Sequence, residues 1–205
     1  MNLIESYKDE RRALEILNDA FLNTPGIMWV LKRRTKVSNK MTIRILFYEG
    51  MAKKGAYMTS DKNGVLLFFA ADNRGFNIFN GFRKVFLVLF FAGIKNGIRL
   101  VKYRKIISEI RPKNALVGFL VATDRKVIGS RAAYEINREM TKIGQLEKRP
   151  ICLETSIPRA KKLYELAGYK VYHTIKHPYE ESTIWFLKKE FKNGKKKNIF
   201  SERKG

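Results

Sequence analysis

The chain has little cysteine, little proline and no linker-like segment. Its 205 residues include one cysteine, Cys152, so no intramolecular disulfide can form, and a reducing cytoplasmic setting is the expectation. The five prolines and 14 glycines are spread along the chain rather than gathered between two halves. We therefore expect one domain over residues 1–191, followed by a basic, flexible tail over residues 192–205.

Long hydrophobic runs are also missing. The most apolar stretch, Val85 to Ile94, is about half of the roughly 20 residues that a transmembrane helix needs, and basic residues flank it on both sides. The sequence predicts a buried helix there and no transmembrane segment. Residues 1–10 carry acidic side chains and lack the basic-then-apolar pattern of a signal peptide, which again favours a cytoplasmic protein.

Acidic residues are scarce compared with basic ones. The sequence has 42 lysines and arginines against 19 aspartates and glutamates, a net charge of +23. Such a field attracts nucleotide co-substrates, nucleic acids and acidic lipid surfaces alike. Charge alone therefore predicts an anionic partner without choosing among these classes.

The hydrophobic periodicity predicts helices alternating with strands. Helices are expected at 7–23, 37–54, 82–108 with a break near Gly93 or Gly97, and 128–146. Strands are expected at 113–123, 182–187 and in a hairpin whose Asn63-Gly64 pair supplies positive φ angles, at 55–60 and 65–70. Strands that alternate with helices predict an α/β sheet.

The segment from Pro150 to Tyr172 is the most informative part of the chain. A short apolar strand is followed by Ser156 and Pro158, which suit the N-cap and the first turn of a helix. Gly168 can adopt the left-handed backbone that ends a helix, and the residues after it read as a returning strand.

The motifs in this segment, Glu-Thr-Ser-x-Pro at 154–158 and Leu-Tyr-Glu-x-x-Gly-Tyr at 163–169, resemble the C-terminal half of the GNAT acetyltransferase superfamily. The resemblance covers about residues 114–189. It implies a single-domain GNAT-like α/β fold with a central mixed, mostly antiparallel sheet flanked by helices. It also implies an N-acetyltransferase that moves an acetyl group from acetyl-CoA to a small-molecule or peptide amine by direct transfer in a ternary complex.

A second motif is altered. In the superfamily, a loop of pattern Gln/Arg-x-x-Gly-x-Gly/Ala binds the pyrophosphate of acetyl-CoA through its amides, at a helix start that favours phosphate. Here Asp124 and Val127 stand at the first and fourth positions, and only the last glycine, Gly129, is retained. By resemblance, the cofactor contacts fall on Val121 and Ala122 at the strand end, on Arg159, and on Lys126, Val127, Ile128, Gly129 and Ser130.

The resemblance assigns the chemistry to Tyr164, which matches the tyrosine that protonates the leaving thiolate of CoA. The alternative to this catalytic role is that Tyr164 is a core tyrosine whose hydroxyl forms a hydrogen bond with a nearby group. Glu154 is the best-placed carboxylate to take the proton from the acceptor amine. The alternative to this role as a base is that Glu154 is a structural carboxylate that accepts hydrogen bonds from the backbone or from an arginine.

Two other interpretations remain open from the sequence, and a third is disfavoured. The chain could be a non-catalytic GNAT-like scaffold that binds nucleic acid or another polyanion through its basic surface, as the charge and the altered loop suggest. The segment 82–105 could lie on an anionic membrane, although we expect a core helix beside the acceptor side of the cleft. A metal site is not expected, because His173 and His177 would lie about 13 Å apart on a strand and no other ligands accompany them.

Overall fold

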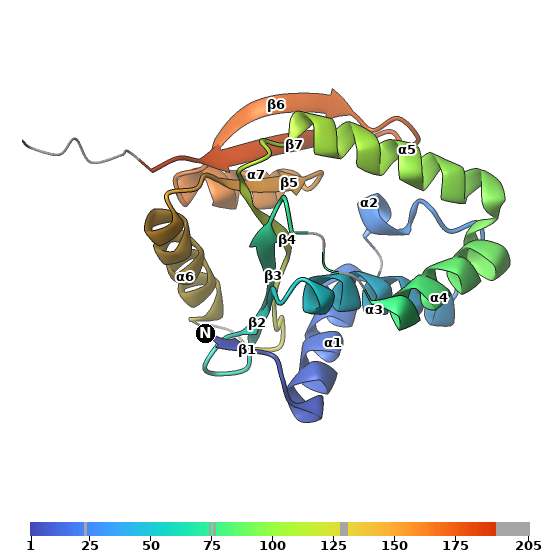
Figure 1. Cartoon of the computed structure of the whole chain (residues 1–205), viewed down its shortest axis with the longest axis horizontal. Helices are drawn as coiled ribbons and strands as arrows, with labels where there is room; N and C mark the ends of the chain where they lie inside the picture. Colours follow the sequence, from blue (N-terminus) through green and yellow to red (C-terminus); the bar gives the residue numbers. More distant parts are fainter. Residues whose placement is uncertain (23, 74, 76, 128–130, 192–205) are drawn as a thin grey trace, which may run out of the picture.

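A computed structural model describes residues 1–22, 24–73, 75, 77–127 and 131–191 (Figure 1). The elements follow in the order β1 (Asn2–Leu3), α1 (Tyr7–Phe21), α2 (Pro25–Met28), α3 (Lys36–Ala52), β2 (Ala56–Met58), β3 (Gly64–Ala70), α4 (Ile78–Leu87), the π-helical turn η1 (Val88–Ala92), α5 (Ile94–Ile110), β4 (Leu116–Thr123), α6 (Ala132–Glu147), β5 (Ile151–Thr155), α7 (Pro158–Leu166), β6 (Lys170–Lys176) and β7 (Thr183–Lys189). The expected tail at 192–205 lies outside the described residues.

The strands form one open seven-stranded sheet in the order β1-β2-β3-β4-β5-β7-β6. Only β4 and β5 pair in parallel, and every other neighbouring pair is antiparallel. The expected α/β fold with a mixed, mostly antiparallel sheet is therefore confirmed.

Helices cover both faces of the sheet, and β3 shows why its sequence is apolar throughout. Val65 and Leu67 pack in the cluster formed with α1 and α3, whereas Leu66 and Phe68 pack in the cluster formed with α6. Figure 1 shows α6 on one side of this part of the sheet and α1 and α3 on the other. A strand buried on both faces needs apolar residues at every position rather than at alternate ones.

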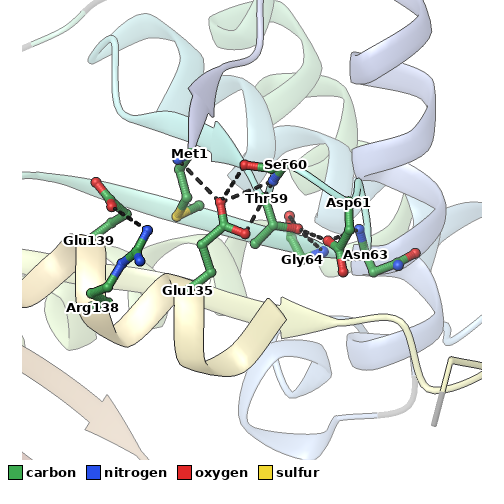
Figure 2. Close-up of polar contacts among 9 residues, drawn as sticks. All are labelled: Met1, Thr59, Ser60, Asp61, Asn63, Gly64, Glu135, Arg138 and Glu139. Atoms are coloured by element: carbon green, nitrogen blue, oxygen red, sulfur yellow. Dashed lines mark hydrogen bonds and ion pairs between the residues drawn. The ribbon is translucent and has the colours of Figure 1, made fainter. Parts of the chain in front are cut away.

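The hairpin before β3 forms as predicted, but its turn differs from the expectation. Lys62, not the Asn-Gly pair, takes the positive φ, at 56°. Gly64 serves packing instead, since a Cβ there would lie 2.9 Å from the Cβ of Ala132 on α6. The turn is tied to the same helix by Glu135, whose carboxylate accepts hydrogen bonds from the Ser60 backbone and hydroxyl and pairs with the Met1 amino group (Figure 2).

The start of α7 also differs from the expectation. Ile157 rather than Ser156 is the N-cap residue, and it makes no side-chain cap. Thr155 accepts a hydrogen bond from the Ile157 amide, which fixes the entry into the helix. Gly168 adopts φ +89° after the helix ends, as predicted.

The segment 78–110 contradicts the expectation of a buried helix. It forms α4, η1 and α5 with a break at Gly93, one of the two predicted positions, where φ is +77°. However, α5 contains no buried residue, and most large apolar side chains of α4 and η1 face solvent. Helix α4 packs on α3, and α5 runs from the end of η1 toward β6 and β7 (Figure 1).

Candidate active site

The candidate site begins where β4 and β5 separate. The two strands pair only over Leu116–Gly118 and Ile151–Leu153. β4 then continues to Thr123, held by β3 alone, and β5 continues to Thr155, held by β7. Within the described residues, the facing edges beyond Gly118 carry no strand-to-strand pairing, so their backbone groups can bind an extended ligand. Val121 and Ala122 lie on this free part of β4, as predicted, although the parting starts earlier, after Gly118.

A β-bulge explains why the strands part at this point. Leu67 of β3 faces Leu120 and Phe68 faces Gly118, which leaves Phe119 as an extra residue in β4. A bulge bends its strand and increases the local twist. Here the extra residue follows the last position that pairs with β5, so β4 turns away from its neighbour there. The sequence offered only Gly118 as a hint, since an isolated glycine in a strand is typical of bulges.

The loop after β4 is anchored on the side of Asp124. Its carboxylate pairs with Arg12 of α1 and also accepts a hydrogen bond from the Lys126 amide at 2.9 Å. The Lys126 amide and the Arg12 side chain together hold the pKa of Asp124 below its ordinary value. Asp124 is thus neutralised by Arg12 and hydrogen-bonded to its own loop, which reduces the repulsion that an unpaired carboxylate would exert on a phosphate.

Of the five loop residues predicted to contact phosphate, the structure describes Lys126 and Val127. The Val127 amide donates a long hydrogen bond of 3.4 Å to the Asp124 carbonyl, so the amides at 126 and 127 already have partners within the loop. The Lys126 side chain is exposed, and Val127 is 40% exposed and belongs to neither core cluster. Ile128, Gly129 and Ser130 lie outside the described residues.

Tyr164 and Arg159 come from α7, which follows β5. Tyr164 is half-buried against the cluster around Tyr169, with ring centroids 5.9 Å apart. Burial raises the pKa of its hydroxyl. Among the described residues no hydrogen bond to this hydroxyl occurs, which removes the local partner that a purely structural tyrosine would have. Arg159 is exposed and has no ion-pair partner in the described part of the chain.

Glu154 is held by an arginine that the sequence did not indicate. Its two carboxylate oxygens accept hydrogen bonds from Nε and Nη2 of Arg111, both at 2.8 Å. Both side chains are more than 80% buried. Burial alone would lower the pKa of Arg111, but the adjacent Glu154 raises it above its ordinary value. This geometry matches the structural alternative for Glu154, and its predicted role as a base stays a prediction.

The turn between β6 and β7 adds groups that sequence reasoning missed. It lies between Lys176, the end of β6, and Thr183, the start of β7. Thr155, the last residue of β5, pairs with Trp185, so β7 extends two residues past the end of β5 before it meets the turn. The turn therefore projects past the end of β5, at the end of the sheet where β4 is free. Its His177 packs against Tyr103 and Trp29, with ring centroids 4.7 and 5.1 Å apart.

Three polar atoms in this turn are buried without a hydrogen-bond partner among the described residues: Nε2 of His177, Oε2 of Glu180 and Oγ of Ser182. His177 is 5% exposed, its Nδ1 accepts a hydrogen bond from the Tyr179 amide, and burial lowers its pKa, so the ring is neutral with the proton on Nε2. Burial raises the pKa of Glu180, and Arg34 opposes this from 3.6 Å. A buried donor and a buried acceptor without partners are costly unless a ligand satisfies them.

Within the described residues, no group of three or more histidine, cysteine or acidic side chains is arranged to hold a metal ion. The same residues include no helix with the length and apolar content needed to span a bilayer.

No family model and no curated protein matches the sequence, but solved structures match the fold. A protein from Corynebacterium glutamicum described as histone acetyltransferase HPA2 and related acetyltransferase superposes with a TM-score of 0.62 at 18% identity, over 91% of this chain and 93% of that chain. An agmatine N-acetyltransferase gives 0.57 at 6% identity, over 91% and 97%. A putative arylalkylamine N-acetyltransferase from the mosquito Aedes aegypti gives 0.56 at 14% identity, over 91% and 85%. The chain has a GNAT-like fold.

Proposed function

We propose that this chain is an N-acetyltransferase that moves the acetyl group of acetyl-CoA directly to an amine bound beside it. The observation that carries the proposal is the separation of β4 and β5 after Gly118, with the bulge at Phe119 on one side of the gap. Similarity in fold to agmatine and arylalkylamine N-acetyltransferases supports an amine acceptor. The pantetheine arm would lie along the free edge of β4, where Val121 and Ala122 offer main-chain groups.

The residues that follow β4 and β5 carry charges that suit an anionic thioester. Asp124 is paired with Arg12. Lys126, which follows β4, and Arg159, in the first turn of α7 after β5, are exposed cations. A main-chain N–H of β4 directed at the thioester carbonyl would stabilise the negative charge that develops on its oxygen. Because the amides at 126 and 127 are already engaged, the phosphates would depend on these cations and on the amides that follow.

The transfer step needs one acid and one base. The amine nitrogen forms a bond to the carbonyl carbon, and the carbon–sulfur bond breaks. The thiolate sulfur takes a proton from the Tyr164 hydroxyl, which its raised pKa keeps protonated at neutral pH. An acceptor that enters as an ammonium gives one proton to a carboxylate before attack, and the second proton leaves the nitrogen after attack and returns through solvent to the Tyr164 oxygen. We assign the carboxylate to Glu180, whose Oε2 has no hydrogen-bond partner among the described residues, in preference to the sequence candidate Glu154, whose oxygens are engaged by Arg111.

The acceptor would enter beside the turn between β6 and β7. There the aromatic rings of Trp29, Tyr103 and Tyr179 pack around the His177 imidazole, and the same turn carries the Glu180 carboxylate, whose Oε2 is buried. A protonated amine carried on an apolar group fits such surroundings, because aromatic faces and a carboxylate both attract a cation. The amine must lose its proton before attack, which is consistent with a carboxylate of raised pKa nearby.

The direct test is binding and turnover with purified protein. Titration calorimetry should give saturable binding of acetyl-CoA, and a thiol-reactive dye should report release of CoA when arylalkylamines or short polyamines are added. Absence of acetyl-CoA binding at millimolar concentration would exclude the proposal. Binding without CoA release by any amine would leave the fold as a scaffold that has lost its chemistry.

A further inference from the structure

Helices α4 and α5 expose an unusually large apolar surface. Ten large apolar side chains on this segment are each at least 44% exposed; we call them the outer row: Ile78, Phe79, Phe82, Val85, Phe86, Leu89, Phe90, Ile94, Ile98 and Val101. Over α4 and η1 they recur at spacings of three and four residues, so they share one face of the helix. Contiguous apolar surface of this kind marks an interaction site.

The orientation of the outer row is fixed by the polar face of the same helix. Asn80 on the opposite face is 3% exposed and donates a hydrogen bond to the Ile45 carbonyl of α3 at 2.9 Å. Lys84 pairs with the buried Glu49 of α3 at 3.1 Å, and Arg104 of α5 pairs with the same carboxylate. The side of α4 that faces α3 thus carries polar and charged groups beside the buried Leu87, while the outer row faces away from the protein.

The charge around the outer row is mainly positive, although Glu109 near the end of α5 pairs with Lys105 at 3.9 Å. Residues 78–108 contain seven basic and no acidic side chains. Glu49 neutralises part of the charge of Lys84 and Arg104. Within the part of the chain that the structure describes, Lys95, Arg99 and Lys102 of α5 form no ion pair. An open hollow of about 490 Å³ on α5 is lined by Ile94, Ile98 and Tyr179 together with Lys95, Arg99 and Lys102. Apolar contacts beside three cations suit a lipid chain beneath an anionic headgroup.

We propose that the outer row docks on an anionic lipid bilayer, with α4 and α5 lying in the plane of the membrane surface. Phenylalanine and aliphatic side chains would enter the boundary of the acyl chains, and Lys95, Lys102 and Lys105 would contact anionic headgroups. A second copy of the chain fits less well as the occupant, because each copy carries a net charge of +23 and brings the same basic residues to the contact.

The experiment is co-sedimentation of the full chain with lipid vesicles. Vesicles of phosphatidylcholine mixed with phosphatidylserine should carry the protein into the pellet, whereas vesicles of phosphatidylcholine alone should bind it at least about tenfold more weakly. Replacing Phe79, Phe82 and Phe90 together by serine should reduce the partition to mixed vesicles by about a hundredfold or more. Replacing Lys95 and Lys102 by glutamine should reduce it by about tenfold to thirtyfold.

Matched controls distinguish docking through the outer row from nonspecific binding by exposed apolar or basic side chains elsewhere. Leu146→Ser with Leu166→Ser removes two side chains that are 72% and 86% exposed elsewhere, and Lys142→Gln with Lys170→Gln removes two exposed lysines; both should bind as the wild type does. Thermal unfolding of each variant verifies its fold. Equal binding to both kinds of vesicle, no binding to either, or wild-type binding by the serine variant would overturn the proposal. So would a dimer in light scattering that the serine variant dissociates, because a second copy would then cover the outer row.

Discussion

At the scale of single residues, the hydroxyl of Tyr164 separates a catalytic from a structural reading. Replacing Tyr164 by phenylalanine removes only this oxygen, which has no hydrogen-bond partner among the described residues. We expect the melting temperature to stay within about a degree of the wild type and kcat to fall by about a hundredfold, because the thiolate loses its proton donor. Stopped-flow detection of released CoA measures the rate.

The control for this variant is Tyr134→Phe, a tyrosine that is 68% exposed on α6 and far in sequence from the proposed acid. It should leave both the rate and the melting temperature unchanged. An undiminished kcat in Tyr164→Phe with acetyl-CoA still bound would remove Tyr164 from the mechanism and leave it a packing residue of the cluster around Tyr169.

A second prediction concerns the two carboxylates. Glu180→Gln should lower kcat/KM by about a hundredfold near neutral pH. Because burial raises the pKa of Glu180, the wild-type rate should fall as the pH drops through that value and the carboxylate becomes protonated, and the variant should lack this acid limb. A pH profile of kcat/KM measures the difference.

Glu154→Gln provides the matched comparison. It should reduce the free energy of unfolding by about 3 kcal/mol, because Arg111 would be left largely buried without a charged partner, while turnover at saturating substrate changes little. The opposite pattern, a lost acid limb in Glu154→Gln and a normal profile in Glu180→Gln, would return the base to Glu154.

At the scale of elements, Glu49 connects three helices. It lies on α3, is 8% exposed, and pairs with Lys84 of α4 and Arg104 of α5. Burial alone would raise the pKa of Glu49, but the two cations hold it below its ordinary value. Its contribution to stability is therefore complete above the ordinary glutamate pKa of about 4.3 and is lost as the pH falls through the lower value of the folded state.

We therefore expect the wild type to lose stability between about pH 4.3 and the lower pKa of Glu49, more steeply than Glu49→Gln does. At pH 7 the variant should be destabilised by about 1–2 kcal/mol, because both cations are partly exposed and can return to water. Chemical unfolding at a series of pH values measures this. Parallel stability curves for the two proteins would show that the carboxylate does not couple these helices.

At the scale of the whole molecule, the net charge of +23 supports a second candidate function, a scaffold that binds nucleic acid. The engaged amides at 126 and 127 favour it, since they weaken the phosphate loop. If binding to RNA or DNA occurs through the basic surface, its affinity should fall by orders of magnitude as salt rises from about 50 to 200 mM. Filter binding across that range measures it.

Acetyl-CoA binding should respond differently. Because much of a bound thioester would lie against the backbone of β4 rather than on surface charge, we expect its affinity to fall less than about tenfold over the same range of salt. Affinity for acetyl-CoA that declines as steeply as that for nucleic acid would indicate binding of a polyanion by the general field and would favour the scaffold.

Much of the fold followed from local patterns. The helix start at Pro158, the left-handed Gly168 and the continuous apolar run of β3 each carry enough local information to place an element, because backbone geometry restricts which residues fit. The prediction failed for α4, whose apolar stripe was expected inside. Periodicity shows that a helix has an apolar face but not whether another element covers it.

The sequence by itself determined the α/β fold, the resemblance carried by residues 154–169, and the position of Tyr164 on the helix after β5, since each depends on residues that are neighbours in the chain. Only the tertiary structure decided that Arg111 holds Glu154, that Arg12 neutralises Asp124, that Phe119 bulges where β4 leaves β5, and that Glu180 is buried beyond the end of β5. The two ion pairs join residues 43 and 112 positions apart, and the other two features depend on how strands pair and where a turn folds. No local pattern encodes which distant side chain will lie within hydrogen-bond distance.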